Sequence, residues 1–283
     1  MTADVEDALA RAEAAFATGQ RTPFDFQRRA WRAYLEGRSG LINAATGTGK
    51  TLAAAVGPLV ETPRAPAGLR LLWITPLRAL ANDLAINLQA ACELLQTNWR
   101  VGIRTGDTSA SQRRQQRTNP PQILVLTPES LSVLLSDEAT EAPLASLRAI
   151  VVDEWHELLG TKRGVQLELC LAHVRALAPG LRTWGLSATL PNLEQACEAL
   201  VGNGASGELI RSDIVKPLVL ESVLPPDVSR FPWAGHLGVR LLAPVIDAIE
   251  QSRTTLLFTN TRSQAELWYQ AIANARRDWL TSV

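Results

Sequence analysis

Six short runs rich in Leu, Ile and Val recur along the chain, and each ends in a turn or a polar residue. They begin at residues 40, 69, 99, 122, 147 and 181. Longer stretches with helical periodicity separate them, of which residues 77–96 are the clearest. Runs that are apolar throughout are typical of strands buried on both faces, so the alternation predicts an α/β fold with a doubly wound parallel sheet. Such sheets bind ligands at the carboxyl ends of their strands.

Composition adds few constraints on function. The 283 residues carry no formal net charge, so nucleic-acid affinity would have to come from a local basic face. The three cysteines are scattered without a C-x-x-C pair, which argues against a disulfide framework or a zinc site and favours a reducing, cytoplasmic environment. The acidic N-terminus is unlike a secretion signal, and no apolar run is long enough to span a membrane.

The pattern also predicts the domain organisation. Residues 1–20 are expected to form an N-terminal helix, and residues 21–212 the first α/β domain. A Gly/Pro-rich stretch without periodicity, at about residues 202–238, marks a boundary, and the linker is expected over 213–237. Residues 238–283 are expected to begin a second α/β unit, with a strand at 254–261 between two helices.

The stretch AATGTGKT, residues 44–51, follows the first apolar run and precedes a helical pattern. Gly47 and Gly49 would let backbone N–H groups wrap a phosphate, and Lys50 would reach its outer oxygens. Thr51, at a helix N-terminus, could ligate Mg²⁺. Ala44 stands where the general phosphate-loop pattern has Gly. The predicted nucleotide-binding residues of this loop are Thr46, Gly47, Thr48, Gly49, Lys50 and Thr51.

The stretch VVDEWH supplies the complementary acids. A buried strand over 149–152 would deliver Asp153 to hold Mg²⁺ and Glu154 to orient and deprotonate the attacking water. Taken alone, the stretch would favour a solvated acidic turn, and it is the phosphate loop that favours the catalytic interpretation. His156 could be a capping or core-edge histidine, and its place after the acid pair favours a role in coupling this site to the rest of the protein.

The motifs FDFQRRAW, AATGTGKT, TPLRALAND, TGD, TPESL, VDEWHE and LSATL occur in this order. Together they resemble superfamily 2 helicases of the DExH type. Within these the chain is similar to the large helicase-related family, including its bacterial branch linked to DNA ligase and repair genes. The resemblance implies a RecA-like P-loop NTPase fold followed by the start of a second RecA-like domain. It also implies ATP and Mg²⁺ as ligands, and a 3′ to 5′ motor.

The resemblance further assigns roles to individual residues. Gln27 would read the adenine edge. Ser187, Ala188 and Thr189 would couple the nucleotide site to strand engagement, although capping after a strand is the alternative. Single-stranded nucleic acid would be contacted by Thr75, Pro76, Arg78, Thr105, Gly106, Thr127, Pro128 and Glu129, and by Thr259, Asn260 and Arg262 in the second unit. Such small and polar residues suit contacts that position a strand without reading its sequence.

One basic stretch remains open to two interpretations. Residues 104–118 contain four arginines, Arg104, Arg113, Arg114 and Arg117, against the single acid Asp107. They could form an auxiliary phosphate-binding surface. A solvated helix face explains the same pattern equally well.

Two classes of function therefore compete. The favoured class is an ATP-driven translocase or helicase on single-stranded DNA, for which the family implies a role in DNA repair with ligase and nuclease partners. An RNA or RNA:DNA hybrid helicase is the variant of it. The other class is a non-catalytic module that binds ATP and nucleic acid, because the 283 residues carry only the opening of a second lobe. For the same reason we expect this chain alone to hydrolyse ATP slowly and not to unwind a duplex.

Overall fold

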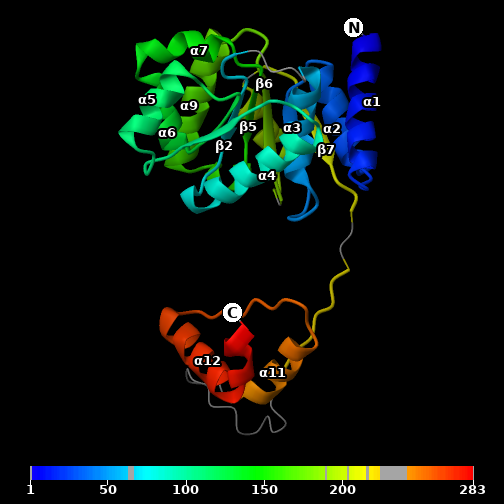
Figure 1. The fold of residues 1–283 in the computed structure, drawn as a ribbon, viewed down its shortest axis with the longest axis vertical. Helices are drawn as coiled ribbons and strands as arrows, with labels where there is room; N and C mark the ends of the chain where they lie inside the picture. The colour runs from blue at the N-terminus through cyan, green and yellow to red at the C-terminus, as the bar shows by residue number, and fades with distance from the viewer. Residues whose placement is uncertain are drawn as a thin grey trace. The chain divides into compact units, whose positions relative to one another are not determined.

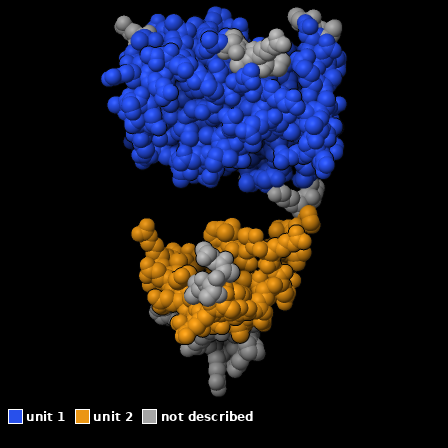
Figure 2. Space-filling view, viewed as in Figure 1, with its two compact units in different colours: residues 1–215 blue, residues 216–283 orange. Residues whose placement is uncertain are grey.

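The computed structural model describes residues 2–62, 67–188, 190–202, 204–214, 217–223 and 241–282. The chain divides into two compact units, Met1–Val215 and Lys216–Val283, shown in separate colours in Figure 2. The first unit contains the sheet and the predicted nucleotide motifs. Each unit is described by itself below.

Unit 1 is built on one sheet. In the part of unit 1 that the structure describes, seven strands pair in the order β3-β4-β2-β5-β6-β1-β7, and every pair is parallel. The strands are β1 (Gly40–Asn43), β2 (Leu71–Ile74), β3 (Val101–Arg104), β4 (Ile123–Leu126), β5 (Ala149–Val152), β6 (Arg182–Ser187) and β7 (Glu208–Arg211). Six of them coincide with the six apolar runs, so the expected parallel sheet is confirmed.

Helices connect these strands and cover both faces of the sheet (Figure 1). Those of unit 1 are α1 (Thr2–Thr18), α2 (Asp25–Leu35), α3 (Lys50–Glu61), α4 (Ala81–Leu94), α5 (Ala110–Thr118), α6 (Pro128–Leu135), α7 (Glu141–Ala145), α8 (Trp155–Leu158), α9 (Lys162–Leu177) and α10 (Leu193–Val201). Short 3₁₀ turns lie at Arg78–Leu80 and Glu138–Thr140. In Figure 1, α5, α6, α7 and α9 gather on the side of unit 1 opposite α1 and α2.

Alternate strand residues point to opposite faces, and each face has its own apolar core. On strand β5, Val151 packs in the core that α1, α2, α3 and α4 cover. Its neighbours Ile150 and Val152 pack in the core that α6, α9 and α10 cover. All three side chains are fully buried. Because both faces are covered, only the strand ends can present polar groups, and the predicted motifs lie at the carboxyl ends.

Strand β7 was not predicted from the sequence. It lies within the stretch interpreted as lacking periodicity, and it pairs with β1 at the edge of the sheet. Only one of its four residues, Ile210, is buried. An edge strand with one buried side chain gives too weak an apolar signal to stand out beside glycine-rich sequence.

Unit 2 differs from what its sequence suggests. Its described residues form α11 (Leu242–Glu250), α12 (Arg262–Ala275) and a 3₁₀ turn, Arg277–Ser282. The strand predicted at 254–261 is wrong, because these residues have no strand assignment and Leu256 and Phe258 are exposed. A strand needs a neighbour for its backbone hydrogen bonds, and no other described segment of unit 2 is extended as a partner.

Candidate nucleotide site and strand cleft

The phosphate loop follows β1 and leads directly into α3. Gly47 and Gly49 have φ values of 75° and 87°, in the left-handed region that glycine adopts without strain. A Cβ atom at Gly49 would lie 2.6 Å from Nε2 of Gln27, so this position also needs glycine for space. Gly49 is the N-cap of α3, whose first residue is Lys50. The loop therefore leads into a helix N-terminus, and the first N–H groups of a helix have no acceptor within the helix, which favours an anion there.

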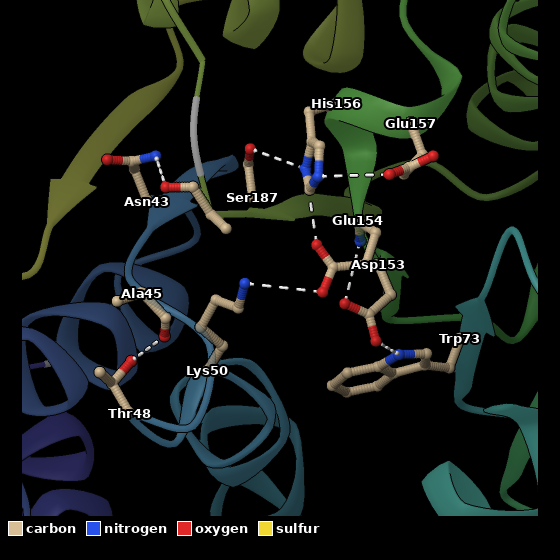
Figure 3. A network of polar contacts seen from close by, with 11 residues as sticks. Asn43, Ala45, Thr48, Lys50, Trp73, Asp153, Glu154, His156, Glu157 and Ser187 are labelled. Carbon is tan, nitrogen blue, oxygen red and sulfur yellow. Dashed lines mark hydrogen bonds and ion pairs between the residues drawn. The ribbon is translucent and has the colours of Figure 1, made fainter. Parts of the chain in front are cut away.

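Lys50 and Glu154 face one another across this loop (Figure 3). The Lys50 side chain is 8% exposed, and its Nζ lies 3.7 Å from Oε1 of Glu154. Neither Nζ of Lys50 nor Oε2 of Glu154 has a hydrogen-bond partner within the described residues, although both atoms are buried. Buried charged atoms without hydrogen bonds are costly, and they indicate groups held ready for a ligand.

Asp153 lies at the end of β5 beside this pair. Its Oδ1 accepts a hydrogen bond from the Glu154 backbone N–H at 2.9 Å, and its Oδ2 accepts one from the Trp73 indole at 3.4 Å. Burial, and then the neighbouring Glu154 carboxylate, raise the pKa of Asp153, while the Trp73 hydrogen bond opposes the shift. A cation bound at this carboxylate would offset both unfavourable effects.

The residues present fit a magnesium ion. The Thr51 hydroxyl and the Asp153 carboxylate are oxygen donors that line the same pocket. In the described part of the chain, no group of three or more His, Cys, Asp or Glu side chains gathers as a metal cage. Magnesium usually takes one or two protein oxygens together with phosphate oxygens and waters, so this sparse donor set is what a phosphate-bound ion requires.

The nucleotide pocket has a volume of ≈ 670 Å³, within the range of about 300–1,000 Å³ that is usual for ligand sites. It is lined by the phosphate loop, by Asp153 and Glu154, by Gly19 and Arg21, and by one side of α4. Sequence reasoning did not identify the contributions of Arg21 or α4. Neither segment carries a motif, and only the packing of α4 against α3 brings it here.

Gln27, on α2, contacts the phosphate loop. Its side chain is buried, its Nε2 donates to the Gly49 carbonyl at 3.0 Å, and its Oε1 accepts from the Phe24 N–H at 2.9 Å. The amide thus ties the start of α2 to the loop that precedes Lys50. Its predicted role as an adenine reader stays a prediction, whereas its support of the phosphate loop is visible in these contacts.

Glu154 has an unusual backbone conformation. Its φ of 44° and ψ of 49° lie in the left-handed region, which residues other than glycine seldom adopt. The chain turns here from β5 into α8, and the turn brings the Glu154 carboxylate beside His156. Strain of this kind is typical of functional sites, where the surrounding structure holds it in place.

His156 links the acid pair Asp153 and Glu154 to the predicted coupling segment, residues 187–189. Its Nδ1 lies 3.5 Å from Oε2 of Glu154 and 3.2 Å from Oγ of Ser187, a fully buried residue at the end of β6 (Figure 3). Asn43, at the end of β1, donates to the Ala188 carbonyl at 3.1 Å. The predicted coupling residues Ser187 and Ala188 are therefore tied to both nucleotide motifs. Thr189 lies outside the described residues.

A second cleft, of ≈ 450 Å³, opens at the ends of β2, β3 and β4. It brings together residues of all three predicted strand-contacting loops of unit 1, namely Pro76, Arg78, Thr105, Gly106, Thr127 and Glu129. The loops are separated in the sequence but adjacent in space, because β3-β4-β2 are neighbours in the sheet.

The threonines of these loops are buried and make local hydrogen bonds within the loops. Thr75, Thr105 and Thr127 are all buried. Thr127 is the N-cap of α6 and accepts from the Ser130 N–H at 3.4 Å, with Pro128 as the first residue of the helix. The Thr75 hydroxyl reaches the Leu77 carbonyl at 3.5 Å. The exposed charged side chains of the cleft are instead Arg78, Glu129 and Arg163.

Arg163 was missed by sequence reasoning and organises this cleft. Its Nε lies 2.5 Å from Oε1 of Glu129, and its NH2 donates to the Pro76 carbonyl at 2.8 Å. The hydrogen bond from Arg163 is the main cause that lowers the pKa of Glu129. Arg163 therefore connects the loop after β2, which contains Pro76, to the loop after β4, which contains Glu129. Its position soon after VDEWHELLG was the only available signal.

The three predicted contacts of unit 2 lie around the start of α12. The Thr259 hydroxyl donates to the Thr261 carbonyl at 3.1 Å, and Thr261 caps the helix that Arg262 begins. Asn260 and Arg262 are exposed. These contacts place the residues at one helix N-terminus within unit 2.

A phosphate loop and a carboxylate pair at the carboxyl edge of a parallel sheet define a P-loop NTPase fold of the RecA-like class. Comparison with known proteins narrows the class. The model of the DEAD/DEAH box helicase family matches residues 24–196, and the chain belongs to this family.

Named relatives give a finer picture. The chain is 36% identical over 269 residues to the ATP-dependent helicase Lhr-Core of Methanothermobacter thermautotrophicus, covering 87% of this chain and 31% of that protein. It is 34% identical over 287 residues to the Lhr helicase/probable uracil glycosylase of Mycolicibacterium smegmatis, covering 94% of this chain and 19% of that protein. The chain thus spans a third or less of these relatives.

A solved structure agrees. The Mycobacterium smegmatis helicase Lhr bound to ssDNA and AMP-PNP matches with a TM-score of 0.81 and 31% identity, over 95% of this chain and 36% of that one. The predicted resemblance to the large helicase-related family is therefore confirmed, for the N-terminal portion of such proteins. Among the helices that the structure describes, none is both long and apolar enough to cross a membrane.

Proposed function

We propose that this chain is the ATP-hydrolysing part of a motor that moves along single-stranded nucleic acid. The observation that carries the proposal is the placement of two sites at one edge of one sheet. The ≈ 670 Å³ pocket holds the groups for phosphate chemistry, and the ≈ 450 Å³ cleft gathers the three contact loops. The strand between them, β2, contributes Trp73 to the first site and precedes the loop of the second.

The residues of the nucleotide site have separate tasks in this proposal. The phosphate-loop N–H groups and Lys50 hold the β and γ phosphates, and Lys50 neutralises charge that grows as the terminal phosphoryl group is transferred. Glu154 orients a water molecule and accepts its proton. Thr51 and Asp153 would hold Mg²⁺, and the ion would supply positive charge to offset that of the phosphate oxygens.

The contact between Ser187 and His156 supports a coupled motor over a simple ATPase. His156 contacts both the proposed base Glu154 and Ser187, so a displacement of one of these residues can be transmitted to the other through part-buried contacts. Such a hydrogen-bonded chain between two sites is a physical route for coupling, which measurement must establish.

For the strand, we favour DNA, because a relative with 31% identity is solved with ssDNA. RNA or an RNA:DNA hybrid is the variant to be distinguished by experiment. The 3′ to 5′ direction, a role in DNA repair, and partnership with DNA ligase or a nuclease remain predictions from the resemblance, and a cytoplasmic location remains a prediction from the scattered cysteines.

The deciding experiment measures ATP turnover with and without a single-stranded oligonucleotide, on this chain and on a version extended to the length of its relatives. Oligo(dT), oligo(rU) and duplex DNA serve as separate arms. Stimulation by a single strand is the expected result. A folded extended protein that hydrolyses ATP at the same rate in all arms would refute a nucleic-acid motor, and one that binds both ligands without turnover would favour the non-catalytic module.

A further inference from the structure

Arg104, the last residue of β3, is an unpaired cation at the strand cleft. It lines the ≈ 450 Å³ cleft and is 6% exposed. Its guanidinium makes no hydrogen bond and no ion pair with any residue that the structure describes. Its guanidinium nitrogens are not among the buried polar atoms that lack a hydrogen-bond partner, so they are open to the cleft. A cation that is largely removed from water and has no carboxylate beside it is unfavourable, and an anion in the cleft would stabilise it.

Its surroundings add to the unfavourable charge. After burial, the charges of Arg113 and then Arg117 lower the pKa of Arg104, and only Asp137 acts in the opposite sense. Arg117 already holds Asp137 in an ion pair at 3.0 Å. The local balance is therefore positive, and an anion entering from the cleft would relieve it.

Arg113 lies next to Arg104 on the cleft wall. Its NH2 donates to the Thr105 and Gly106 carbonyls at 3.4 and 3.2 Å, which closes the TGD loop. Its Nε is buried and has no hydrogen-bond partner in the described part of the chain. Because this Nε is buried, Arg113 adds positive charge beside the Arg104 guanidinium and not a donor that is open to the cleft.

The other two arginines of the cleft are already paired. Arg163 forms a two-point pair with Glu129, and Arg78 lies 3.4 Å from Asp107. Both pairs are exposed, and their carboxylates offset much of the attraction that each arginine could offer a phosphate. The cations that remain available to a strand are the less exposed ones.

We propose that Arg104, with Arg113 beside it, binds a backbone phosphate of the single strand and supplies the main salt-sensitive contact of this cleft. The proposal rests on the proposed function, and it names a contact outside the predicted motif residues. A guanidinium suits this task because its planar set of donors matches two phosphate oxygens. The basic stretch 104–118 is then neither a uniform binding surface nor only a solvated helix face.

The test compares Arg104→Gln with Arg114→Gln. Arg114 is exposed on α5 and does not line the cleft, so the two variants lose the same charge from neighbouring segments. Binding of fluorescent oligo(dT) is measured over a range of salt concentrations, and thermal melting of each variant is recorded. A second arm uses oligo(rU).

We expect Arg104→Gln to weaken oligo(dT) binding about tenfold, the value of a hydrogen bond to a charged group, and to lower the salt slope by about 0.7. Its melting temperature should stay equal or rise, because an unpaired buried charge is removed. Arg114→Gln should change neither binding nor slope to a comparable extent. Equal losses for oligo(rU) would support a phosphate contact.

Several results would overturn the proposal. One is a wild-type salt slope that Arg104→Gln and Arg114→Gln lower equally, which would leave the motor function standing. Another is a loss confined to oligo(dT), which would place the contact on base or sugar. A lower melting temperature with unchanged binding would make Arg104 structural. A wild-type protein that binds no single strand would remove the proposed function together with this inference.

Discussion

The nucleotide pocket and the strand cleft lie at the same edge of one sheet but treat charge in opposite ways. In the pocket, the buried Lys50 and the half-buried Glu154 lie 3.7 Å apart, and Nζ of Lys50 and Oε2 of Glu154 are buried atoms without hydrogen bonds in the described residues. In the cleft, Arg78 and Arg163 are exposed and paired with carboxylates. The first arrangement keeps unfavourable charges ready for chemistry, and the second holds loops together.

This difference in the treatment of charge predicts which substitutions should have large effects on activity. Desolvated charges act strongly on a ligand, whereas exposed pairs are screened and contribute little. Substitutions in the nucleotide pocket should therefore change rates by orders of magnitude, and those of the exposed cleft pairs by small factors. Arg104 stands between the two, since it lines the cleft but is buried and unpaired like the pocket residues.

The largest effect is expected for Lys50→Ala. It should abolish ATP hydrolysis, because Lys50 is the cation that neutralises the transferring phosphate, and it should leave the fold intact. Turnover and thermal melting are measured together. Lys162→Ala is the matched control, since Lys162 is exposed at the start of α9. Retained hydrolysis in a folded Lys50→Ala variant would sink the assignment.

Glu154→Gln should slow hydrolysis by about 10²–10⁴-fold, the usual range for a positioned acid–base group, while binding of ATP and Mg²⁺ persists. The amide keeps the size of the side chain but removes the base. Turnover and equilibrium nucleotide binding are both measured, with the exposed Glu198→Gln as control. If Glu154→Gln lost ATP binding as severely as Lys50→Ala, the division of labour between Asp153 and Glu154 would be wrong.

A smaller effect is expected for Ser187→Ala, which removes the hydroxyl 3.2 Å from His156. The ratio of strand-stimulated to unstimulated turnover should fall by up to about tenfold, the value of one intramolecular hydrogen bond. Thr183→Val is the control, because Thr183 lies on the same strand and its buried hydroxyl has no partner in the described residues. Equal ratios in the two variants would exclude Ser187 from the coupling.

The smallest effect is expected for Arg78→Gln. Its pair with Asp107 spans 3.4 Å on the surface, so affinity for oligo(dT) should fall by less than about threefold. The same salt titration that is used for Arg104→Gln measures it. A loss as large as that of Arg104→Gln would remove the contrast between paired and unpaired cations in the cleft.

Sequence reasoning was strongest where chemistry depends on neighbouring residues. The phosphate loop and the acid pair each lie in one short stretch directly after a buried strand. Their positions at the carboxyl ends of strands could therefore be predicted from the sequence. Five of the six predicted strands are internal to the sheet, where burial on both faces leaves a continuous apolar run, and the sixth, β3, lies at its edge. The structure brings these motifs together as expected, while their catalytic roles await the measurements above.

What the sequence could not show depends on contacts across long separations. The pairing of Arg163 with Glu129 joins residues 34 positions apart, and the indole of Trp73 reaches Asp153 across 80. The isolation of Arg104 is equally invisible, because a lone arginine at a strand end looks like any other. The strand predicted at 254–261 failed because an apolar run specifies a strand only where a neighbouring strand is present.

The central claim, that the two sites are coupled, is tested most directly by one thermodynamic measurement. The affinity for oligo(dT) is determined with and without saturating AMP-PNP, and the affinity for AMP-PNP with and without oligo(dT). We predict that each ligand changes the affinity for the other by the same factor, within the range of about 5–150 that is typical of coupled sites. A factor of one, in a protein that binds both ligands, would contradict the account.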